Sequence, residues 1–367
     1  MNFPKTRAFA LLDTTALQRN FCLLQALATQ REPNVRTIAV VKANAYGHGA
    51  AAVLPALWRA GCRHFAVATP NEALEARTLC PKAEVLVLGY TPPALAPELA
   101  AAGITQTVFS ADYAAALGAA LRGQPLCVHL KIDTGLCRQG FAPEDEAGLL
   151  AALNHPNLRP TGLYTHFPCA DTDPCGTRLA FRRFCDCRAR LSALGHPLFS
   201  HAAASAALLS LPETCADGVR PGLALYGIPP VEAALPLAPV LTLCAPVVQV
   251  REVPACCAVG YGGDFVTSRP SRIGVLPLGY ADGFPRALGG LAVTVRHKGY
   301  PYPARVVGRV CMDLLTVDLT DSPAEVGDTV VLWRDVTAIA RRLRSIPYEV
   351  LTALSPRVER RPLPQNP

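Results

Sequence analysis

The chain has 367 residues, of which 50% are hydrophobic and only 17% charged, and its formal net charge is +7 at pH 7. This composition excludes a disordered chain and is sufficient for two domains with separate cores. No apolar run is long enough to span a bilayer, and the apolar stretch at residues 8–12 is too short for a signal peptide. We therefore expect a cytoplasmic protein without a membrane partner.

The cysteines and the C-terminal arginines predict no additional class of function. None of the fourteen cysteines shows the paired spacing of a zinc site, so no metal site is expected. No aromatic residues interleave with the arginines near the C-terminus, so no nucleic-acid partner is expected either.

The first two-thirds of the chain alternates β-branched apolar runs with amphipathic runs rich in alanine and leucine. The apolar runs predict eight strands, at residues 37–41, 64–68, 84–88, 106–109, 127–132, 162–166, 198–202 and 219–225. Helices are predicted at residues 14–29, 70–79, 111–121, 145–153, 176–194 and 205–211. This α/β alternation over roughly 200 residues favours a (β/α)8 TIM-like barrel. A doubly wound open sheet is the alternative, although no Gly-x-Gly-x-x-Gly follows the first strand.

A proline-dense connector with Pro229, Pro230, Pro236 and Pro239 ends this alternation. Beyond it, short strands with Gly/Pro turns are predicted at residues 240–252, 272–278, 292–296, 304–307, 314–318 and 329–332, with one helix at 335–343. We therefore expect residues 1–235 to form the barrel and residues 236–367 to form a mostly β C-terminal domain.

Lys42 ends the first predicted strand, directly after the apolar run that closes with Val40 and Val41. Apolar surroundings disfavour the ammonium form of a lysine and lower its pKa. A neutral lysine amine is a nucleophile that forms Schiff bases with carbonyl compounds, including pyridoxal 5′-phosphate (PLP). Taken alone, Lys42 is better explained as a side chain that reaches solvent from a strand end.

Other polar residues also lie where predicted barrel strands end, namely Lys131, His166, Ser205 and Arg220. Active sites of such barrels form at the carboxyl ends of the strands. Ser205 and Gly222 are candidates for a phosphate site, although Ser205 could simply cap a helix. Arg220 is a candidate partner for the pyridine nitrogen of PLP, because an arginine leaves that nitrogen largely unprotonated, which suits racemisation.

Racemisation requires an acid/base group on each face of the planar intermediate. Lys42 is one candidate. Tyr261, between Gly260 and Gly262, is the other, although this short motif alone is more typical of an aromatic residue that packs on a domain surface.

Several motifs in order resemble the bacterial alanine racemase family, which is PLP-dependent and of fold type III. The motifs are Val40-Val41-Lys42-Ala43-Asn44-Ala45-Tyr46-Gly47-His48-Gly49, His129-Leu130-Lys131-Ile132-Asp133-Thr134-Gly135, Thr165-His166-Phe167, Arg220-Pro221-Gly222, Gly279-Tyr280-Ala281-Asp282-Gly283, Gly308-Arg309-Val310-Cys311-Met312-Asp313 and Tyr348-Glu349-Val350. The resemblance implies a barrel followed by a β domain, a head-to-tail homodimer, and interconversion of L- and D-alanine for peptidoglycan synthesis.

The resemblance also implies roles for individual residues. Lys42 would carry PLP covalently and act as the base on the D face, and Tyr261 of the other subunit would act on the L face. His166 and Arg220 would form a hydrogen-bonded line to Tyr261, with Arg220 also facing the pyridine nitrogen. The remaining roles are phosphate binding by Tyr46, Ser205, Gly222, Leu223 and Tyr348, substrate binding by Arg138 and Met312, carbamylation of Lys131, and lining of the site entry by Tyr280.

The chain departs from the family pattern at two places. Leu136 and Cys137 stand before Arg138 where the family commonly has Met-Gly, and Ala204 stands where it commonly has Asn. A racemase of serine or of several amino acids is an alternative. A PLP-dependent decarboxylase and a single-barrel PLP carrier are less favoured, because of Arg220 and of the second domain respectively.

Overall fold

The computed structural model describes residues 7–30 and 32–363, and the chain divides into two compact units. The barrel unit comprises Thr15–Ala45 and Val53–Ala238. The β unit comprises Tyr46–Ala52 together with the described parts of Met1–Thr14 and Pro239–Pro367.

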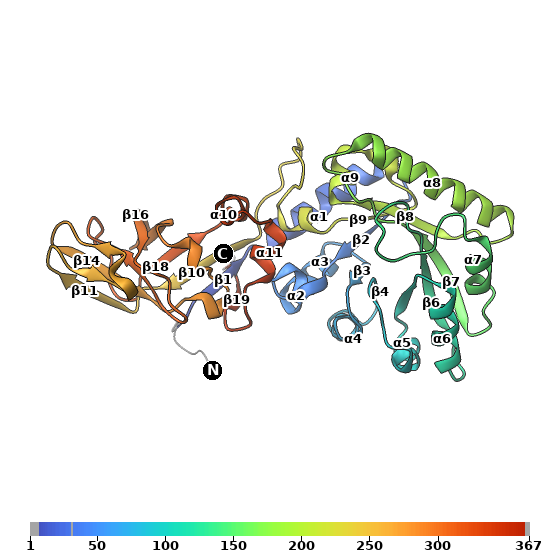
Figure 1. Cartoon of the computed structure of the whole chain (residues 1–367), viewed down its shortest axis with the longest axis horizontal. Helices are drawn as coiled ribbons and strands as arrows, with labels where there is room; N and C mark the ends of the chain where they lie inside the picture. Colours follow the sequence, from blue (N-terminus) through green and yellow to red (C-terminus); the bar gives the residue numbers. More distant parts are fainter. Residues whose placement is uncertain (1–6, 31, 364–367) are drawn as a thin grey trace. The chain divides into compact units, whose positions relative to one another are not determined.

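The barrel unit is built on a closed sheet of parallel strands (Figure 1). In order around the barrel, the strands are β2 (Arg36–Val40), β3 (His64–Val67), β4 (Glu84–Val87), β5 (Thr105–Val108), β6 (Leu126–Lys131), β7 (Leu158–Tyr164), β8 (Phe199–Ala204) and β9 (Gly218–Arg220). The first and last strands pair in parallel, with Arg36 opposite Gly218 and Thr37 opposite Val219. This closure confirms the predicted barrel, and the open doubly wound sheet is wrong.

Helices lie on the outside of the barrel, one before its first strand and the others after most of its strands (Figure 1). They are α1 (Thr14–Thr29), α3 (Ala50–Arg59), α4 (Pro70–Leu79), α5 (Ala96–Ala101), α6 (Ala111–Ala120), α7 (Glu146–Leu153), α8 (Pro174–Ala193) and α9 (Ser205–Ser210), while the short α2 (Lys42–Tyr46) continues directly from β2. In α1, Leu17, Phe21, Leu24 and Ala28 are buried, and their spacing of three and four residues gives the helix one apolar face.

The last barrel strand is shorter than predicted. The sequence predicts a strand at residues 219–225, but β9 ends at Arg220 and a 3-10 helix occupies Leu223–Tyr226. Pro221 has no N–H to donate to a neighbouring strand, so the pairing stops there.

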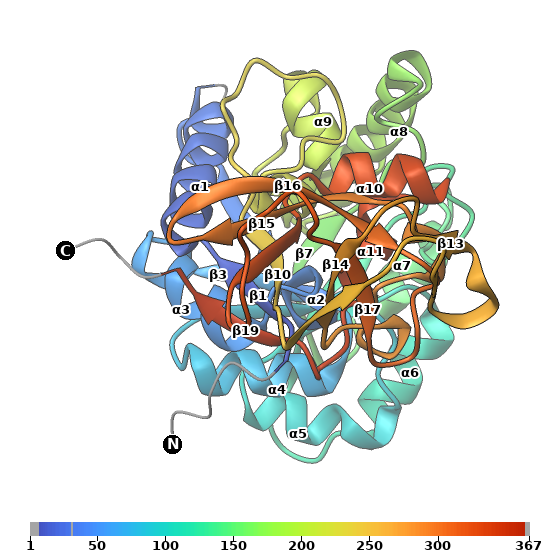
Figure 2. The same ribbon diagram turned by 90° about the vertical axis from the view of Figure 1, so that its left-hand side faces the viewer.

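The β unit contains a nine-stranded sheet in its described residues (Figure 2). Its strand order is β11 (Gln249–Val253), β14 (Ser271–Leu276), β17 (Leu315–Asp318), β16 (Tyr300–Val307), β15 (Ala292–His297), β18 (Thr329–Trp333), β10 (Leu241–Pro246), β1 (Phe9–Leu12) and β19 (Glu359–Pro362). The hairpin β12 (Ala258–Val259) and β13 (Phe265–Val266) and the helices α10 (Val336–Leu343) and α11 (Pro347–Thr352) complete the unit. The single strand predicted at residues 240–252 is in fact β10 and β11, which lie far apart in the sheet.

None of the helices in the described residues is both long and apolar enough to cross a membrane.

Candidate active site

Lys42 begins an unusual turn at the carboxyl end of β2. The following residues Ala43, Asn44, Ala45 and Tyr46 have φ values of 53°, 52°, 55° and 53°, which is the left-handed helical region. This conformation costs roughly 1–2 kcal/mol for each residue with a side chain. Such strain persists only where the surrounding structure imposes it, and it is concentrated at functional sites.

The Glu72 carboxylate helps to hold this turn in place. It accepts a hydrogen bond of 2.7 Å from the N–H of Ala43, and others from the N–H groups of Ala68 (2.8 Å) and Thr69 (3.2 Å). Glu72 also belongs to the capping box at the start of α4, in which the Thr69 hydroxyl accepts from the N–H of Glu72. One carboxylate therefore connects the Lys42 turn to the next barrel helix.

Lys42 itself is half-buried, and its pKa is lowered from the usual value by burial and by the nearby positive charge of Arg138, against an opposing effect of Glu72. Lys131 is buried at the end of β6, and its pKa is lowered to about 8, mainly by burial and then by Arg138. Both amines are consequently easier to deprotonate than an exposed lysine, which is the property predicted for Lys42.

The loop after β6 carries Arg138. The Asp133 carboxylate accepts hydrogen bonds from the N–H groups of Gly135 (2.9 Å), Cys137 (3.0 Å) and Arg138 (2.9 Å). This folds the loop back on its own start and leaves the Arg138 side chain exposed. Leu136 and Cys137, the two predicted departures from the family pattern before Arg138, lie in this loop.

Arg220 is buried at the end of β9, and its guanidinium is held by three groups. It bonds Nδ1 of His201 and donates to the carbonyl oxygens of Thr165 (2.6 Å) and Ala202 (2.9 Å). Its central carbon lies 5.0 Å from the ring centroid of Tyr164. Burial lowers the pKa of Arg220 to about 10, so the side chain remains charged at neutral pH.

Four of the predicted site residues lie close enough to His166 for their positive charges to affect its pKa. Burial, followed by the charges of Arg220, Arg138, Lys131 and Lys42, lowers the pKa of His166 to about 3. All four cations follow or end barrel strands at their carboxyl ends, where a barrel active site is expected. Such an accumulation of positive charge favours an anionic ligand. No hydrogen bond joins His166 to Arg220 within the described residues, so the structure does not contain the line predicted between them.

Ser205 organises the loop after β9. Its hydroxyl accepts hydrogen bonds from the N–H groups of Gly222 (2.9 Å) and Ala224 (3.3 Å). The residue at the N-cap position of α9 is Ala204, which makes no side-chain cap. The hydroxyl therefore holds the Gly222–Ala224 segment, and it is not the helix cap that was the alternative interpretation.

In the β unit, Tyr46 and Tyr348 lie together. Their ring centroids are 5.8 Å apart, and burial followed by the proximity of Tyr348 raises the pKa of the Tyr46 phenol. The next residue, Gly47, has a φ of +75°, and a Cβ there would lie 2.1 Å from the Leu351 carbonyl oxygen. Only glycine allows this approach of the two segments.

Tyr261, Tyr280 and Met312 line one cavity of about 510 Å³ in the β unit. Tyr261 is 72% exposed and Met312 is 54% exposed. The backbone at Gly260 and Gly262 has positive φ values of 79° and 76°, so the Tyr261 turn depends on its glycines. The sequence motifs that predicted an L-face base and a substrate contact thus come together in space.

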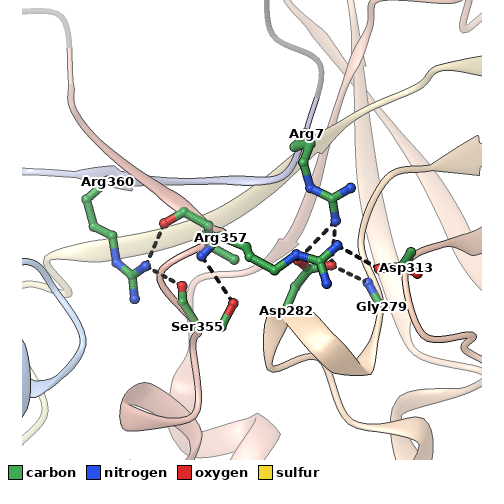
Figure 3. A network of polar contacts seen from close by, with 8 residues as sticks. Arg7, Gly279, Asp282, Asp313, Ser355, Arg357 and Arg360 are labelled. Carbon is green, nitrogen blue, oxygen red and sulfur yellow. Dashed lines mark hydrogen bonds and ion pairs between the residues drawn. The ribbon is translucent and has the colours of Figure 1, made fainter.

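A buried carboxylate positions the turn that carries Tyr280 (Figure 3). Asp282 is 1% exposed, contacts Arg7 at 3.0 Å and Arg357 at 3.2 Å, and accepts a hydrogen bond of 2.9 Å from the N–H of Gly279. The N–H of Tyr280 in turn donates to the carbonyl of Cys311, next to Met312. Asp282 therefore holds the turn of Tyr280, whose backbone contacts the Cys311–Met312 segment; the motif alone predicted no role for Asp282.

His201 and His129 are the main residues of the barrel interior whose role was missed. His201 is the ring partner of Arg220, and its Nε2 lies 2.9 Å from Nδ1 of His129. His129 lies two residues before Lys131 on β6, so the two side chains point to the same face of the strand. This period of two was the available signal.

Comparisons with known proteins agree over nearly the whole chain. The model "Alanine racemase, N-terminal domain" matches residues 12–230, and "Alanine racemase, C-terminal domain" matches residues 240–362. Alanine racemase 2 of Caldanaerobacter subterraneus subsp. tengcongensis is 40% identical, over 97% of this chain and 94% of its own length.

Solved structures are similar over the same extent. The biosynthetic alanine racemase of Pseudomonas aeruginosa is 37% identical, with a TM-score of 0.81 over 98% of this chain and 99% of that one. The alanine racemase of Bacillus anthracis with bound L-Ala-P is 29% identical, with a TM-score of 0.87 over 98% and 95% of the two chains.

Proposed function

The chain belongs to the alanine racemase family, and we propose that it interconverts L-alanine and D-alanine with PLP as its cofactor. The observation that carries the proposal is a lysine of lowered pKa, Lys42, at the carboxyl end of a barrel strand beside Arg138. In a cytoplasmic enzyme, the product D-alanine would serve peptidoglycan synthesis.

The residues at the carboxyl end of the barrel fit PLP. The group would be held covalently by Lys42, and its phosphate by the segment Gly222–Leu223 that Ser205 organises. Tyr46 and Tyr348 would supply phenol groups to the same phosphate. When bound, PLP withdraws electrons from the substrate Cα and so makes its proton acidic.

Arg220 would face the pyridine nitrogen. Within the described residues, the Arg220 guanidinium makes three hydrogen bonds with its five N–H donors. The other two N–H groups are left for a ligand. Because Arg220 stays charged and only donates, it favours an unprotonated nitrogen and limits the electron withdrawal. His166, whose low pKa keeps it neutral, would lie beside this pair.

Two groups would move the proton. The Lys42 amine would remove or return it on the D face, helped by the pKa that burial and Arg138 lower. The Tyr261 phenol would act on the L face. Since Tyr261 and Met312 are largely exposed in the β unit, we propose that they act in the site of a partner subunit, within a head-to-tail homodimer.

The substrate carboxylate would be bound by the Arg138 guanidinium and by the Met312 N–H. The buried Lys131 has a pKa of about 8, so a useful fraction of its amine is neutral and able to react with CO2. We propose that Lys131 is carbamylated, because the resulting anion would fix the Arg138 side chain. Tyr280, which shares a cavity with Tyr261, would line the entry to the site.

The proposal is tested with purified protein incubated with PLP and then with borohydride. We expect the reagent to fix the cofactor on Lys42, as seen by peptide mass mapping, and to leave no label in a Lys42→Ala variant. Incubation with L-alanine should yield D-alanine without release of CO2. Label on another lysine, or CO2 as a product, would refute the proposal.

The shared site is tested by mixing two inactive chains. Lys42→Ala and Tyr261→Phe chains, unfolded and refolded together, should recover some racemase activity, because each heterodimer contains one intact site. Each variant refolded alone is the control. If the mixture stays as inactive as its components, the two residues do not act across subunits.

A further inference from the structure

A second cavity of the barrel unit, of about 370 Å³, lies away from the proposed active site. Its lining includes Arg36, His64, Glu84 and Phe199, which stand at or next to the first residues of barrel strands. The cavity is therefore at the amino end of the barrel, whereas Lys42 and Arg220 lie at the carboxyl end. Its volume is within the range of roughly 300–1,000 Å³ that is common for small-molecule sites.

The rim of this cavity carries an excess of positive charge. Arg36 and Arg159 are both exposed there, and the described residues give the Arg159 side chain neither a hydrogen bond nor an ion pair. The one carboxylate of the lining, Glu84, lies 3.1 Å from His64 Nδ1, and within the described residues it forms no hydrogen bond or ion pair with either arginine. Two guanidinium groups thus remain available for an anion, and both donate in the fork geometry that suits a carboxylate.

The walls between these charges are apolar. Ile38, Phe65, Leu86 and Phe199 line the cavity, and the Arg36 guanidinium lies 4.9 Å from the centroid of the Phe199 ring. A ligand that combines a carboxylate with an apolar body would satisfy both kinds of surface, whereas an inorganic anion would leave the walls unused.

His129 at the floor of the cavity is a hydrogen-bond donor, because its tautomer follows from its hydrogen-bond partners. A guanidinium only donates, so Arg220 donates to Nδ1 of His201, and neutral His201 has its proton on Nε2. That proton is donated to Nδ1 of His129, 2.9 Å away, which places the His129 proton on Nε2. Burial lowers the pKa of His129 to about 4, and the pKa of His201 well below its usual value, so both rings are neutral at pH 7.

This His129 N–H completes the anion site. No described residue accepts a hydrogen bond from it, and His129 lines the cavity. Gly162 on β7 gives the ring its space, because a Cβ at that position would lie 2.5 Å from His129 Nε2. An acceptor in the cavity would therefore extend the line that starts at Arg220.

We propose that this cavity binds a small organic carboxylate, held by Arg36 and Arg159 at the rim and by the His129 N–H at the floor. The hydrogen-bonded line His129–His201–Arg220 connects this carboxylate site to the arginine of the active site. Because the site lies at the opposite end of the barrel, it is separate from the substrate carboxylate site at Arg138.

The proposal is tested by titrating benzoate into the full-length protein in a calorimeter. All measurements use an Arg138→Gln background, which weakens carboxylate binding at the proposed substrate site. In this background, Arg159→Gln should raise the Kd for benzoate at least about tenfold. The matched control Arg182→Gln, which removes the same charge from an exposed position on α8, should change the Kd less than about twofold.

Arg159 is exposed and unpaired within the described residues, so its replacement should not destabilise the protein. Arg159→Gln and Arg182→Gln should therefore unfold at the same temperature, which shows that a change in Kd is not an effect on folding. A second readout uses protein labelled with 15N in histidine, in which benzoate should shift the His129 Nε2–H signal, but not after Arg159→Gln. No binding up to about 10 mM benzoate, or equal Kd values for Arg159→Gln and Arg182→Gln, would overturn the proposal.

Discussion

His166 shows how charge accumulated for a ligand affects the protein that carries it. Its ring is largely removed from water and lies near four cations, Arg220, Arg138, Lys131 and Lys42. Each of them opposes a further positive charge, and burial opposes any charge. These cations, of which Arg138 would bind the substrate carboxylate, thus keep this histidine neutral at neutral pH.

This environment predicts a pH dependence of stability. The pKa of His166 is lowered from 6.5 to about 3, so at intermediate pH the unfolded chain binds a proton that the folded chain does not. Stability is therefore present above pH 6.5 and decreases as the pH falls towards 3. Between about pH 8 and about pH 5 the loss due to His166 should be about 2 kcal/mol.

The measurement is urea unfolding of the native protein and of His166→Asn at several pH values. Between pH 8 and pH 5, the free energy of unfolding of His166→Asn should fall by about 2 kcal/mol less than that of the native protein. His129 and His201 remain in both proteins, so their similar contributions cancel in the difference. Identical pH profiles would contradict the assigned environment.

For individual residues, the sequence predicted a place in the active site where the residue belongs to a distinctive motif. Lys42, Arg138 and Arg220 were expected, and the structure places their charges near one another around His166. His201 and His129 were given no role, because their importance comes from a contact between β6 and β8, 72 residues apart in the chain. Local sequence contains no direct information on which inward-facing residues of a barrel meet.

The left-handed turn in α2 is the most strained element near the site. Its first exposed residue, Ala43, has a φ of 53°, which is unfavourable for alanine and acceptable for glycine. Ala43→Gly should therefore stabilise the protein by about 0.5–1 kcal/mol, because the relief of strain exceeds the greater flexibility of glycine in the unfolded chain.

The control is the same substitution in an ordinary right-handed helix. Ala115→Gly, at an exposed position within α6, should destabilise the protein by about 1 kcal/mol. The free energies of unfolding in urea should thus change with opposite signs. A destabilising Ala43→Gly would mean that the turn is not left-handed in solution.

The turn that contains Asp282 is an element held by one buried charge. Asp282→Asn removes the carboxylate that Arg7 and Arg357 contact. Because both arginines are partly exposed, the loss is that of hydrogen bonds to a charged group, and the free energy of unfolding should fall by about 2 kcal/mol. Asp321→Asn breaks an exposed pair with Arg269 and should have a much smaller effect. Thermal and urea unfolding measure both variants, and similar losses would show that Asp282 does not anchor the turn.

Elements were predicted well where the signal is local. The helices α1 and α4 match the prediction at both ends, because the period of buried residues defines α1 and the capping box with Pro70 defines the start of α4. The strands β1 and β19 were not predicted. Phe9 on β1 pairs with Cys244 and with Glu359, so both strands exist only through partners more than 200 residues away.

In the whole molecule, several large apolar side chains of the β unit are exposed, and the fold of a single chain does not explain why. Tyr261, Tyr280, Met312 and Leu314 line one cavity, and they are 72%, 43%, 54% and 45% exposed. Apolar groups gathered in this way are typical of a surface that another chain covers. The proposed homodimer accounts for the exposure and for the function of Tyr261 together.

A charge placed on this surface should separate the subunits. Leu314→Glu would bury an unpaired carboxylate in the dimer, which should raise the dimer Kd at least about tenfold. Activity per mole of chain should then fall on dilution in parallel with the molar mass from light scattering, because a monomer lacks Tyr261 of a partner. Val326→Glu, at another exposed apolar position in the β unit (64% exposed) outside the cavity, should change neither quantity. A monomeric Leu314→Glu protein that retains full racemase activity would show that each chain holds a complete site.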